Sequence, residues 1–213
     1  DGLADYSSTE TFNDAMKSSR RWGRPREPWK HEVKTDDLGW PVEDAGVIVF
    51  ADRDPEEIEG RYLLAFDGQA TVEPLLGCAT VSDITTDATG RNHAIITVLK
   101  GKNMLMIGFT KTNGGVRNVT LVRESRADKG TFTPELIAAL QPFQVIRFMD
   151  LENTNSQNRK PEPPWFDATP LEWSQRTTPQ HATQACQHGA AYEYVAELAN
   201  VTKKDAWITV PIH

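Results

Sequence analysis

Residues 46–125 contain about seven short apolar segments, and this pattern most constrains what the chain can fold into. Turn residues separate the segments, as at Asp67-Gly68 and at Asn113-Gly114-Gly115, and such pairs favour tight turns. Short strands at regular spacing are typical of antiparallel sandwiches. The pattern therefore predicts a jelly-roll-like β-sandwich of about seven antiparallel strands.

The preceding residues 1–45 are polar and irregular, and they predict a leader that packs on the sandwich. The segment 17–30 combines basic and aromatic residues, as a surface that binds phosphate or RNA would. Residues 1–34 hold seven Lys or Arg and six Asp or Glu, and the whole chain has a net charge of 23 − 30 = −7. A general nucleic-acid binder needs a basic surface, so no nucleic-acid partner is expected. We expect Trp22 and Trp29 to anchor the leader on a neighbouring sheet.

The hydrophobic period changes after a polar linker at 126–132. Thr133 and Pro134 are typical of a helix start. The expected elements are a short helix at 135–140, a strand at 143–149, an amphipathic helix at 189–200 and a strand at 206–212. A strand, a helix and a second strand form a βαβ unit, so the two strands are predicted to be parallel.

A long loop at about 151–188 interrupts this βαβ unit, and it contains five prolines and two tryptophans. A loop of this length inside a compact unit counts against the assignment unless the loop is functional. In (β/α)8 barrels, the loops after the strands build the site. We therefore interpret residues 133–213 as the first quarter of such a barrel, whose partner is the remainder of the barrel, in the same parent chain or in a second chain.

Several motifs support a resemblance to a known group of proteins. They are Gln144–Asp150, Asn153–Asn155, Trp173–Arg176, Glu197–Asn200 and Asp205–Pro211, with Asp37–Pro41 and Gly60–Gly68 in the sandwich part. Together they resemble large secreted bacterial proteins, often labelled carbohydrate- or cellulose-binding, in which a β-sandwich leads into a glycoside-hydrolase-like (β/α)8 barrel. The resemblance covers nearly the whole chain.

The resemblance implies a secreted or cell-surface protein whose partner is a polysaccharide or glycan. It also implies a polysaccharide-degrading glycoside hydrolase with no cofactor. Glycoside hydrolysis needs two carboxyl groups. In barrel glycosidases these typically lie on the fourth and seventh strands, so no catalytic pair can be assigned in this chain. The alternatives are a non-catalytic carbohydrate-binding protein and a surface scaffold, and the sequence does not decide whether the chain is part of an enzyme.

Three residues are candidates for supporting catalysis. Arg147 lies in an apolar strand, where it would orient a carboxylate of a later strand or form a structural ion pair. Asp150 closes the same strand at the end where barrel sites lie, and its alternative role is to cap the loop. His213 follows the second strand directly.

Five residues are candidates for carbohydrate binding: Asn153, Asn155, Trp165, Trp173 and Arg176. Amide groups suit sugar hydroxyls, although Asn is also a turn residue. Indole rings pack well on the C–H faces of sugars, although a loop tryptophan can also anchor its own loop. Arg176 lies beside Trp173 and is a candidate for a salt bridge.

Metal binding and disulfide bonding are weakly indicated. His181, Cys186 and His188 lack the regular ligand spacing of a zinc site, so no metal is expected. Cys78 and Cys186 are 108 positions apart and either pair or remain two independent buried thiols.

No window approaches the roughly 18 apolar residues of a membrane span. The chain begins without Met, so we expect that a preceding segment, a signal peptide or another one, has been removed.

Overall fold

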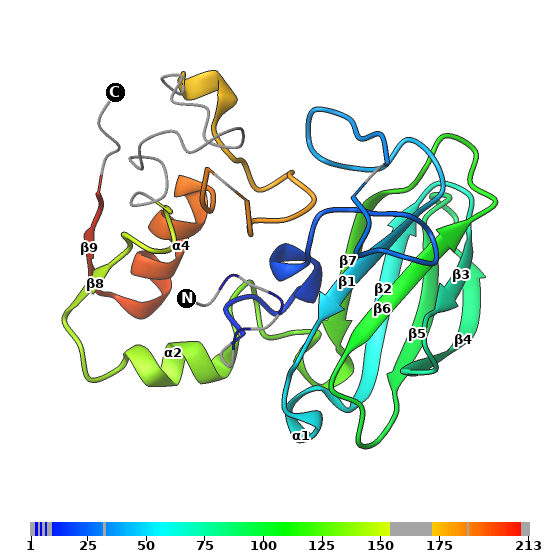
Figure 1. The fold of residues 1–213 in the computed structure, drawn as a ribbon. Coiled ribbons are helices and arrows are strands. Elements are labelled where there is room, and N and C mark those ends of the chain that lie inside the picture. The colour runs from blue at the N-terminus through cyan, green and yellow to red at the C-terminus, as the bar shows by residue number, and fades with distance from the viewer. Residues whose placement is uncertain are drawn as a thin grey trace.

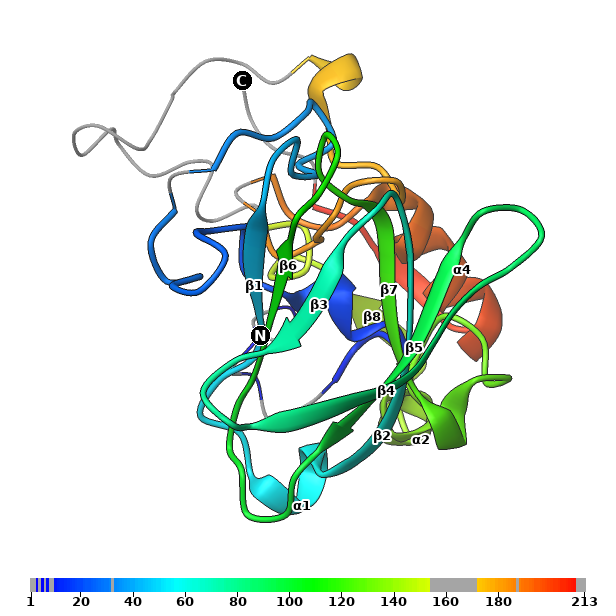
Figure 2. The same ribbon diagram turned by 90° about the vertical axis from the view of Figure 1, so that its right-hand side faces the viewer.

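The computed structural model describes residues 3, 5, 7, 10–31, 33–153, 172–186 and 188–209. Two antiparallel sheets pack beside a smaller unit that contains the last helix and strand (Figures 1 and 2). The strands of the two sheets are β1 (Ala45–Phe50), β2 (Gly60–Asp67), β3 (Thr71–Pro74), β4 (Ala79–Thr86), β5 (Asn92–Val98), β6 (Leu105–Thr110) and β7 (Arg117–Arg123). The short helix α1 (Pro55–Ile58) joins β1 to β2.

The strand order is β1-β6-β3 in the three-stranded sheet and β4-β5-β2-β7 in the four-stranded sheet. All pairings within the two sheets are antiparallel. The prediction of about seven antiparallel strands over 46–125 is therefore confirmed. Its basis is physical, because Gly residues at the turns adopt the positive φ angles that tight turns require, as Gly68 does at 100°.

The core between the sheets is made by alternate residues of each strand. In β2, Tyr62, Leu64 and Phe66 are each at most 2% exposed, whereas their neighbours in the strand are more exposed. The ring of Phe66 meets that of Phe109 from the other sheet edge to face, with centroids 5.4 Å apart. Buried side chains of both sheets belong to one continuous hydrophobic cluster.

The leader covers the outer face of the three-stranded sheet. Gly46 and Gly108 are cross-strand partners, and a Cβ on either would lie within 2.7 Å of the carbonyl oxygen of Pro25. These glycines therefore allow the leader to approach the sheet closely. Trp22 anchors the leader as predicted, since it is 4% exposed and packs on Phe109 with ring centroids 5.6 Å apart. The prediction for Trp29 was wrong, because this side chain is 45% exposed.

We call residues 133–209 the C-terminal unit. Its elements are α2 (Pro134–Leu140), β8 (Val145–Arg147), the 3-10 turn η3 (Trp173–Gln175), α4 (Tyr192–Thr202) and β9 (Asp205–Trp207). β8 and β9 are parallel, which confirms the predicted βαβ connection. The predicted helix start is also confirmed, because the Thr133 hydroxyl accepts the backbone N–H of Leu136 at 3.3 Å.

The last helix and both strands differ in extent from the prediction. Gly189 has φ +72°, a left-handed conformation, so it cannot begin a helix, and α4 starts only at Tyr192. Lys203 ends α4 with φ +56°. Each parallel strand is three residues long because pairing extends only from Val145 opposite Asp205 to Arg147 opposite Trp207.

The C-terminal unit is joined to the rest of the chain by its own hydrophobic cluster. Tyr194 of α4 contacts Phe12 of the leader and Phe132 of the linker, with ring centroids 4.8 and 6.3 Å away. Cys78 and Cys186 are both free thiols, so in the structure the two residues do not form a disulfide bond. None of the described helices is long and apolar enough to cross a membrane.

Candidate functional site

The carboxyl end of β8 leads into a tight turn that places a carboxylate next to the end of β9. Glu152 is 2% exposed, and its Oε2 accepts the backbone N–H of Thr209 at 2.9 Å. The backbone N–H of Glu152 bonds to the carbonyl of Phe148, and Ala190 N–H bonds to the carbonyl of Leu151. Glu152 therefore connects the ends of the two parallel strands, near the start of α4.

Burial raises the pKa of the Glu152 carboxyl above its ordinary value of 4.5. A carboxyl with a higher pKa in the folded state destabilises the fold wherever it is ionised. This destabilisation is absent at a pH below the pKa that the carboxyl has in the unfolded chain. It is complete at a pH above the pKa that the carboxyl has in the folded protein. Burial of the Tyr192 hydroxyl, aided by the negative charge of Glu152, likewise raises the pKa of that hydroxyl.

Glu152→Gln is therefore expected to gain stability relative to the natural protein as pH rises from about 4 to about 7. The amide oxygen can still accept the Thr209 N–H, but no charge is buried. Melting temperatures measured over this range test the expectation. Glu172→Gln is the control, because Glu172 is exposed, and its difference from the natural protein should stay constant. A constant difference for Glu152→Gln as well would contradict the expectation.

Trp173 forms an exposed aromatic surface above the start of α4. Its side chain is 67% exposed, and its indole ring stacks on Tyr192 with centroids 5.7 Å apart and planes at 25°. The guanidinium carbon of Arg176 lies 4.2 Å from the indole centroid. Gln175 Oε1 accepts the backbone N–H of Glu172 at 2.9 Å and so closes the turn that carries the ring.

The salt bridge expected of Arg176 is present. Its Nη2 lies 2.5 Å from Oε1 of Glu193, in the first turn of α4. The structure therefore brings Trp173 and Arg176 together, as their spacing indicated, and adds Tyr192 and Glu193. We call these four residues the aromatic platform.

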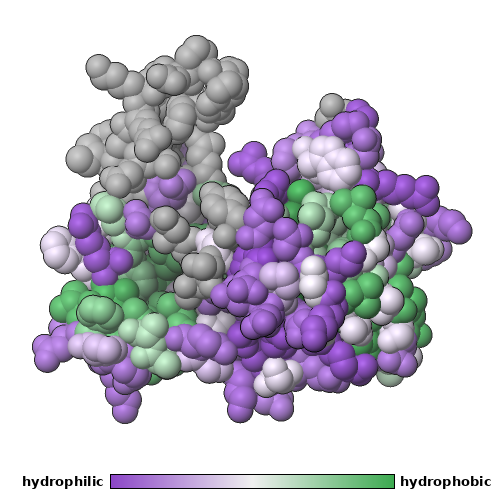
Figure 3. Space-filling view, turned by 60° about the horizontal axis from the view of Figure 1, so that its bottom comes forward, coloured by the Kyte–Doolittle hydropathy of each residue, from purple (hydrophilic) through white to green (hydrophobic). Residues whose placement is uncertain are grey.

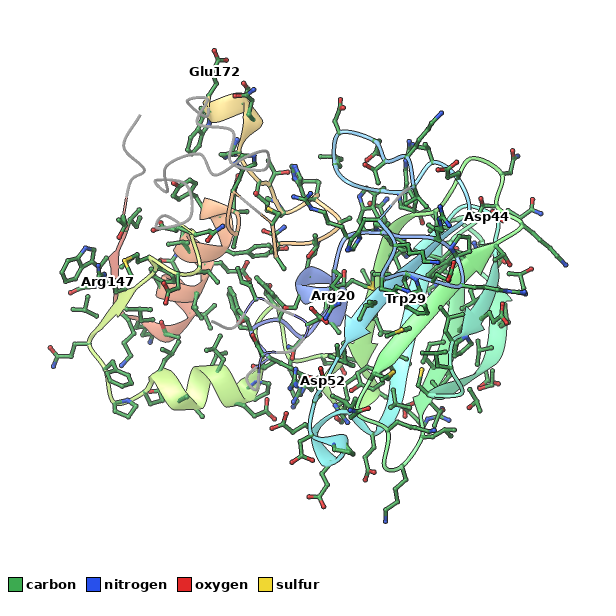
Figure 4. All side chains as sticks on the ribbon, viewed as in Figure 1. Arg20, Trp29, Asp44, Asp52, Arg147 and Glu172 are labelled. Carbon is green, nitrogen blue, oxygen red and sulfur yellow. The ribbon has the colours of Figure 1, made fainter. Side chains whose placement is uncertain are left out.

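Arg147 lies in a different place. Figure 4 shows it beside β8, on the side away from the sandwich, whereas Glu172, next to Trp173, lies at the top of the molecule. Arg147 is exposed, and its expected role of orienting a carboxylate from a later strand stays a prediction. Its guanidinium lies 5.1 Å from the ring centroid of Trp207 and donates to Sδ of Met149 at 3.1 Å. Among the described residues, no carboxylate within ion-pair distance of Arg147 is found.

No described residue covers the face of β8 and β9 that carries Arg147, and we call it the uncovered face. Ile146 and Phe148 point towards α2 and α4, and they join the hydrophobic cluster there. Val145 and Trp207 point the other way and are 50% and 58% exposed. Figure 3 shows further hydrophobic side chains gathered over the C-terminal unit.

Asp150 and Asn153 lie in the turn after β8. Asp150 is exposed, and its backbone carbonyl accepts the N–H of Asn153 at 3.1 Å. Asn153 has φ +50°, a left-handed conformation that Asn tolerates, and this supports its role as a turn residue. The remaining candidates, Asn155, Trp165 and His213, lie outside the described residues.

Within the described part of the chain, no group of three His, Cys, Asp or Glu side chains could hold a metal ion. His181 Nδ1 accepts the backbone N–H of Thr178 at 3.0 Å, so this nitrogen has a structural role. Cys186 lies in the same loop, with its Sγ 3.1 Å from the hydroxyl of Thr177.

Sequence reasoning missed Glu152, Tyr192, Glu193 and Trp207. Glu152 is two residues beyond Asp150 at the strand end, so the strand boundary was a usable signal for it. The contact of Tyr192 with Trp173 spans 19 positions and has no local signal.

The chain matches no family model, no curated protein and no solved structure. The resemblance to carbohydrate-active proteins therefore stays a prediction.

Proposed function

We propose that this chain is the N-terminal part of an extracellular, secreted or cell-surface protein that binds polysaccharide. We further propose that the parent protein is a glycoside hydrolase whose catalytic carboxylates lie beyond this chain. The aromatic platform is the observation that carries the proposal. A tryptophan that is two-thirds exposed yet held by a second ring and an arginine is unusual for a residue with only a packing role.

The chemistry of the platform suits a sugar. The indole side chain is 67% exposed and so offers apolar surface to the C–H face of a pyranose. Arg176 and Glu193 lie beside it and carry a donor and an acceptor for hydroxyl groups. Glu172, adjacent in sequence and exposed, adds a further acceptor.

The outer face of the four-stranded sheet suits a sugar less well. Its outward residues along the described strands β2, β5 and β7 are Arg61, Leu63, Ala65, His93, Ile95, Thr97, Thr120 and Val122. No Trp, Tyr or Phe is among them. The leader covers the outer face of the other sheet. We therefore assign sugar stacking to the C-terminal unit, and we propose that the jelly-roll-like sandwich is an accessory domain.

The uncovered face of β8 and β9 supports the proposal that these strands open a (β/α)8 barrel. In such a barrel, helices cover the outer face of the parallel strands and side chains fill the interior. Here α2 and α4 cover one face, while Val145, Arg147 and Trp207 occupy the other. An interior arginine needs a carboxylate partner, which the remainder of the barrel would supply to Arg147.

Glycan binding by the purified chain tests the proposal, first on an array and then by calorimetry. We expect at least one glycan to bind, and Trp173→Ala to weaken it by about tenfold or more, since loss of a stacked ring removes roughly 1.5 kcal/mol or more. Trp29→Ala is the matched control, because Trp29 is also exposed but lies in the leader. Equal losses for the two variants, or no binding by the natural chain, would refute the proposal.

The non-catalytic binding protein and the surface scaffold predict different outcomes. A scaffold binds no glycan. A binding protein without catalysis binds glycan but has no pair of carboxyl groups about 5–10 Å apart at the strand ends of its complete barrel.

A further inference from the structure

The loop that follows the aromatic platform is fixed to the leader. We call residues 177–186 the strap. Nζ of Lys17 donates to the carbonyl oxygens of Pro179 and His181, at 2.7 and 3.2 Å. Nε1 of Trp40 donates to the carbonyl of Gln180 at 3.1 Å. These contacts join the strap to residues that pack on the sandwich.

Two further contacts complete the attachment. Ala182 is 3% exposed and belongs to the hydrophobic cluster of the sandwich, while its N–H bonds to the carbonyl of Leu38. The hydroxyl of Thr183 donates to the carbonyl of Ser19 at 2.7 Å. The strap is therefore held in place by the sandwich and its leader.

Gln184 connects the strap to α4, and it is completely buried. Its backbone N–H donates to the carbonyl of Lys17 at 2.7 Å. Its side-chain Nε2 donates to the carbonyl of Thr178 at 3.1 Å, and its Oε1 accepts the N–H of Ala191 at 2.8 Å. Gln184 thus joins the leader through its backbone, and its side chain joins the strap to the N-cap residue of α4.

The contact with Ala191 matters because α4 has no cap of its own. Ala191 is the N-cap residue and has no side-chain oxygen, so the first amides of the helix need another acceptor. Gln184, seven positions upstream, provides an acceptor for the N–H of Ala191 itself. The next residue is Tyr192, whose ring stacks on Trp173.

We propose that Gln184 is a positioning residue for the aromatic platform, and that through it the sandwich sets where Trp173 lies. Gln184 fixes the first turn of α4, this turn fixes the ring of Tyr192, and Tyr192 fixes the indole. The importance of this geometry for sugar binding rests on the proposed function, but the positioning itself is measurable without any sugar.

The test uses the full chain labelled with 5-fluorotryptophan, with the fluorine resonance of Trp173 assigned by its loss in Trp173→Phe. Gln184→Met removes both side-chain hydrogen bonds at similar volume. We expect it to shift or broaden the Trp173 resonance and to weaken glycan binding by about tenfold. Gln180→Met is the matched control, because Gln180 is in the same strap but exposed, and both readouts should match the natural chain.

Gln184→Glu keeps the proposal testable if Gln184→Met does not fold. When protonated, its carboxyl accepts the Ala191 N–H and donates to the Thr178 carbonyl, as the amide does. Because Gln184 is completely buried, burial would raise the pKa of a carboxyl at this position well above its ordinary value. We therefore expect a natural Trp173 resonance at about pH 5 and a displaced one at about pH 8. The natural chain is recorded at both values, because Lys17 and His181 also titrate beside the strap.

An unchanged Trp173 resonance in folded Gln184→Met, or in Gln184→Glu at the higher pH, would overturn the positioning role. A purely structural role predicts a lower melting temperature with an unchanged Trp173 resonance and unchanged glycan affinity in the folded protein. If the natural chain binds no glycan, the proposed function fails, and the resonance alone decides on Gln184.

Discussion

Gly189→Ala is expected to destabilise the protein by at least about 3 kcal/mol. A Cβ at this position would lie 2.3 Å from the carbonyl carbon of Glu152 and 2.4 Å from its oxygen. Both atoms belong to the backbone, so they cannot move aside as a flexible side chain could. The residue also has φ +72°, which adds strain for alanine. Chemical unfolding followed by circular dichroism measures the loss.

Gly77→Ala separates the two causes. Gly77 has φ +60°, but a Cβ there would meet nothing within 4 Å. This variant should lose only about 1 kcal/mol, the cost of the backbone conformation. The excess loss in Gly189→Ala then reports the contact with Glu152. Equal losses in the two variants would show that the close approach of the two backbones contributes nothing.

Gly189 also illustrates what the sequence could and could not predict. The run from Gly189 to Asn200 has the composition and period of a helix, and its existence was predicted correctly. Its start was not, because a contact with a residue 37 positions earlier forces the left-handed conformation. Local propensity carries no information about such a contact.

The sheets were predictable because their signals are local. Turn residues and alternating apolar positions occur within each hairpin, so seven strands follow from the sequence alone. The parallel pairing of β8 with β9 was predictable for a similar reason, since a helix joins the two strands. Trp29 was mispredicted because its exposure depends on which surfaces other segments leave uncovered.

The candidate site was predictable only in part. Trp173 and Arg176 are three positions apart, and the pairing of their side chains is a local property. The position of the two side chains in the fold is not a local property, because it depends on Tyr192 from α4 and on Gln184 from the strap. A sequence shows the residue types that can bind a sugar, but the contacts that hold them appear only in the fold.

Phe132→Ala is expected to have the second large effect, a loss of about 3–5 kcal/mol in the free energy of unfolding. Phe132 is 1% exposed. Its ring lies 5.7 Å from that of Phe12 and 6.3 Å from that of Tyr194, between centroids. The variant therefore opens a cavity where leader, linker and α4 meet. Phe143→Ala is the control, because Phe143 is 58% exposed and its loss should stay within about 0.5 kcal/mol.

The same interface predicts how residues 133–213 behave alone. Without Phe12 and Phe132, the buried face of α4 that contains Val195 and Leu198 loses part of its cover, and the other face of β8 and β9 is already exposed. Two parallel strands with both faces poorly covered are unstable. We therefore expect this fragment to melt without a cooperative transition, whereas the full chain melts cooperatively. Cooperative melting of the fragment would mean that its own contacts suffice, and it would contradict both this expectation and the interpretation of the unit as the opening of a barrel.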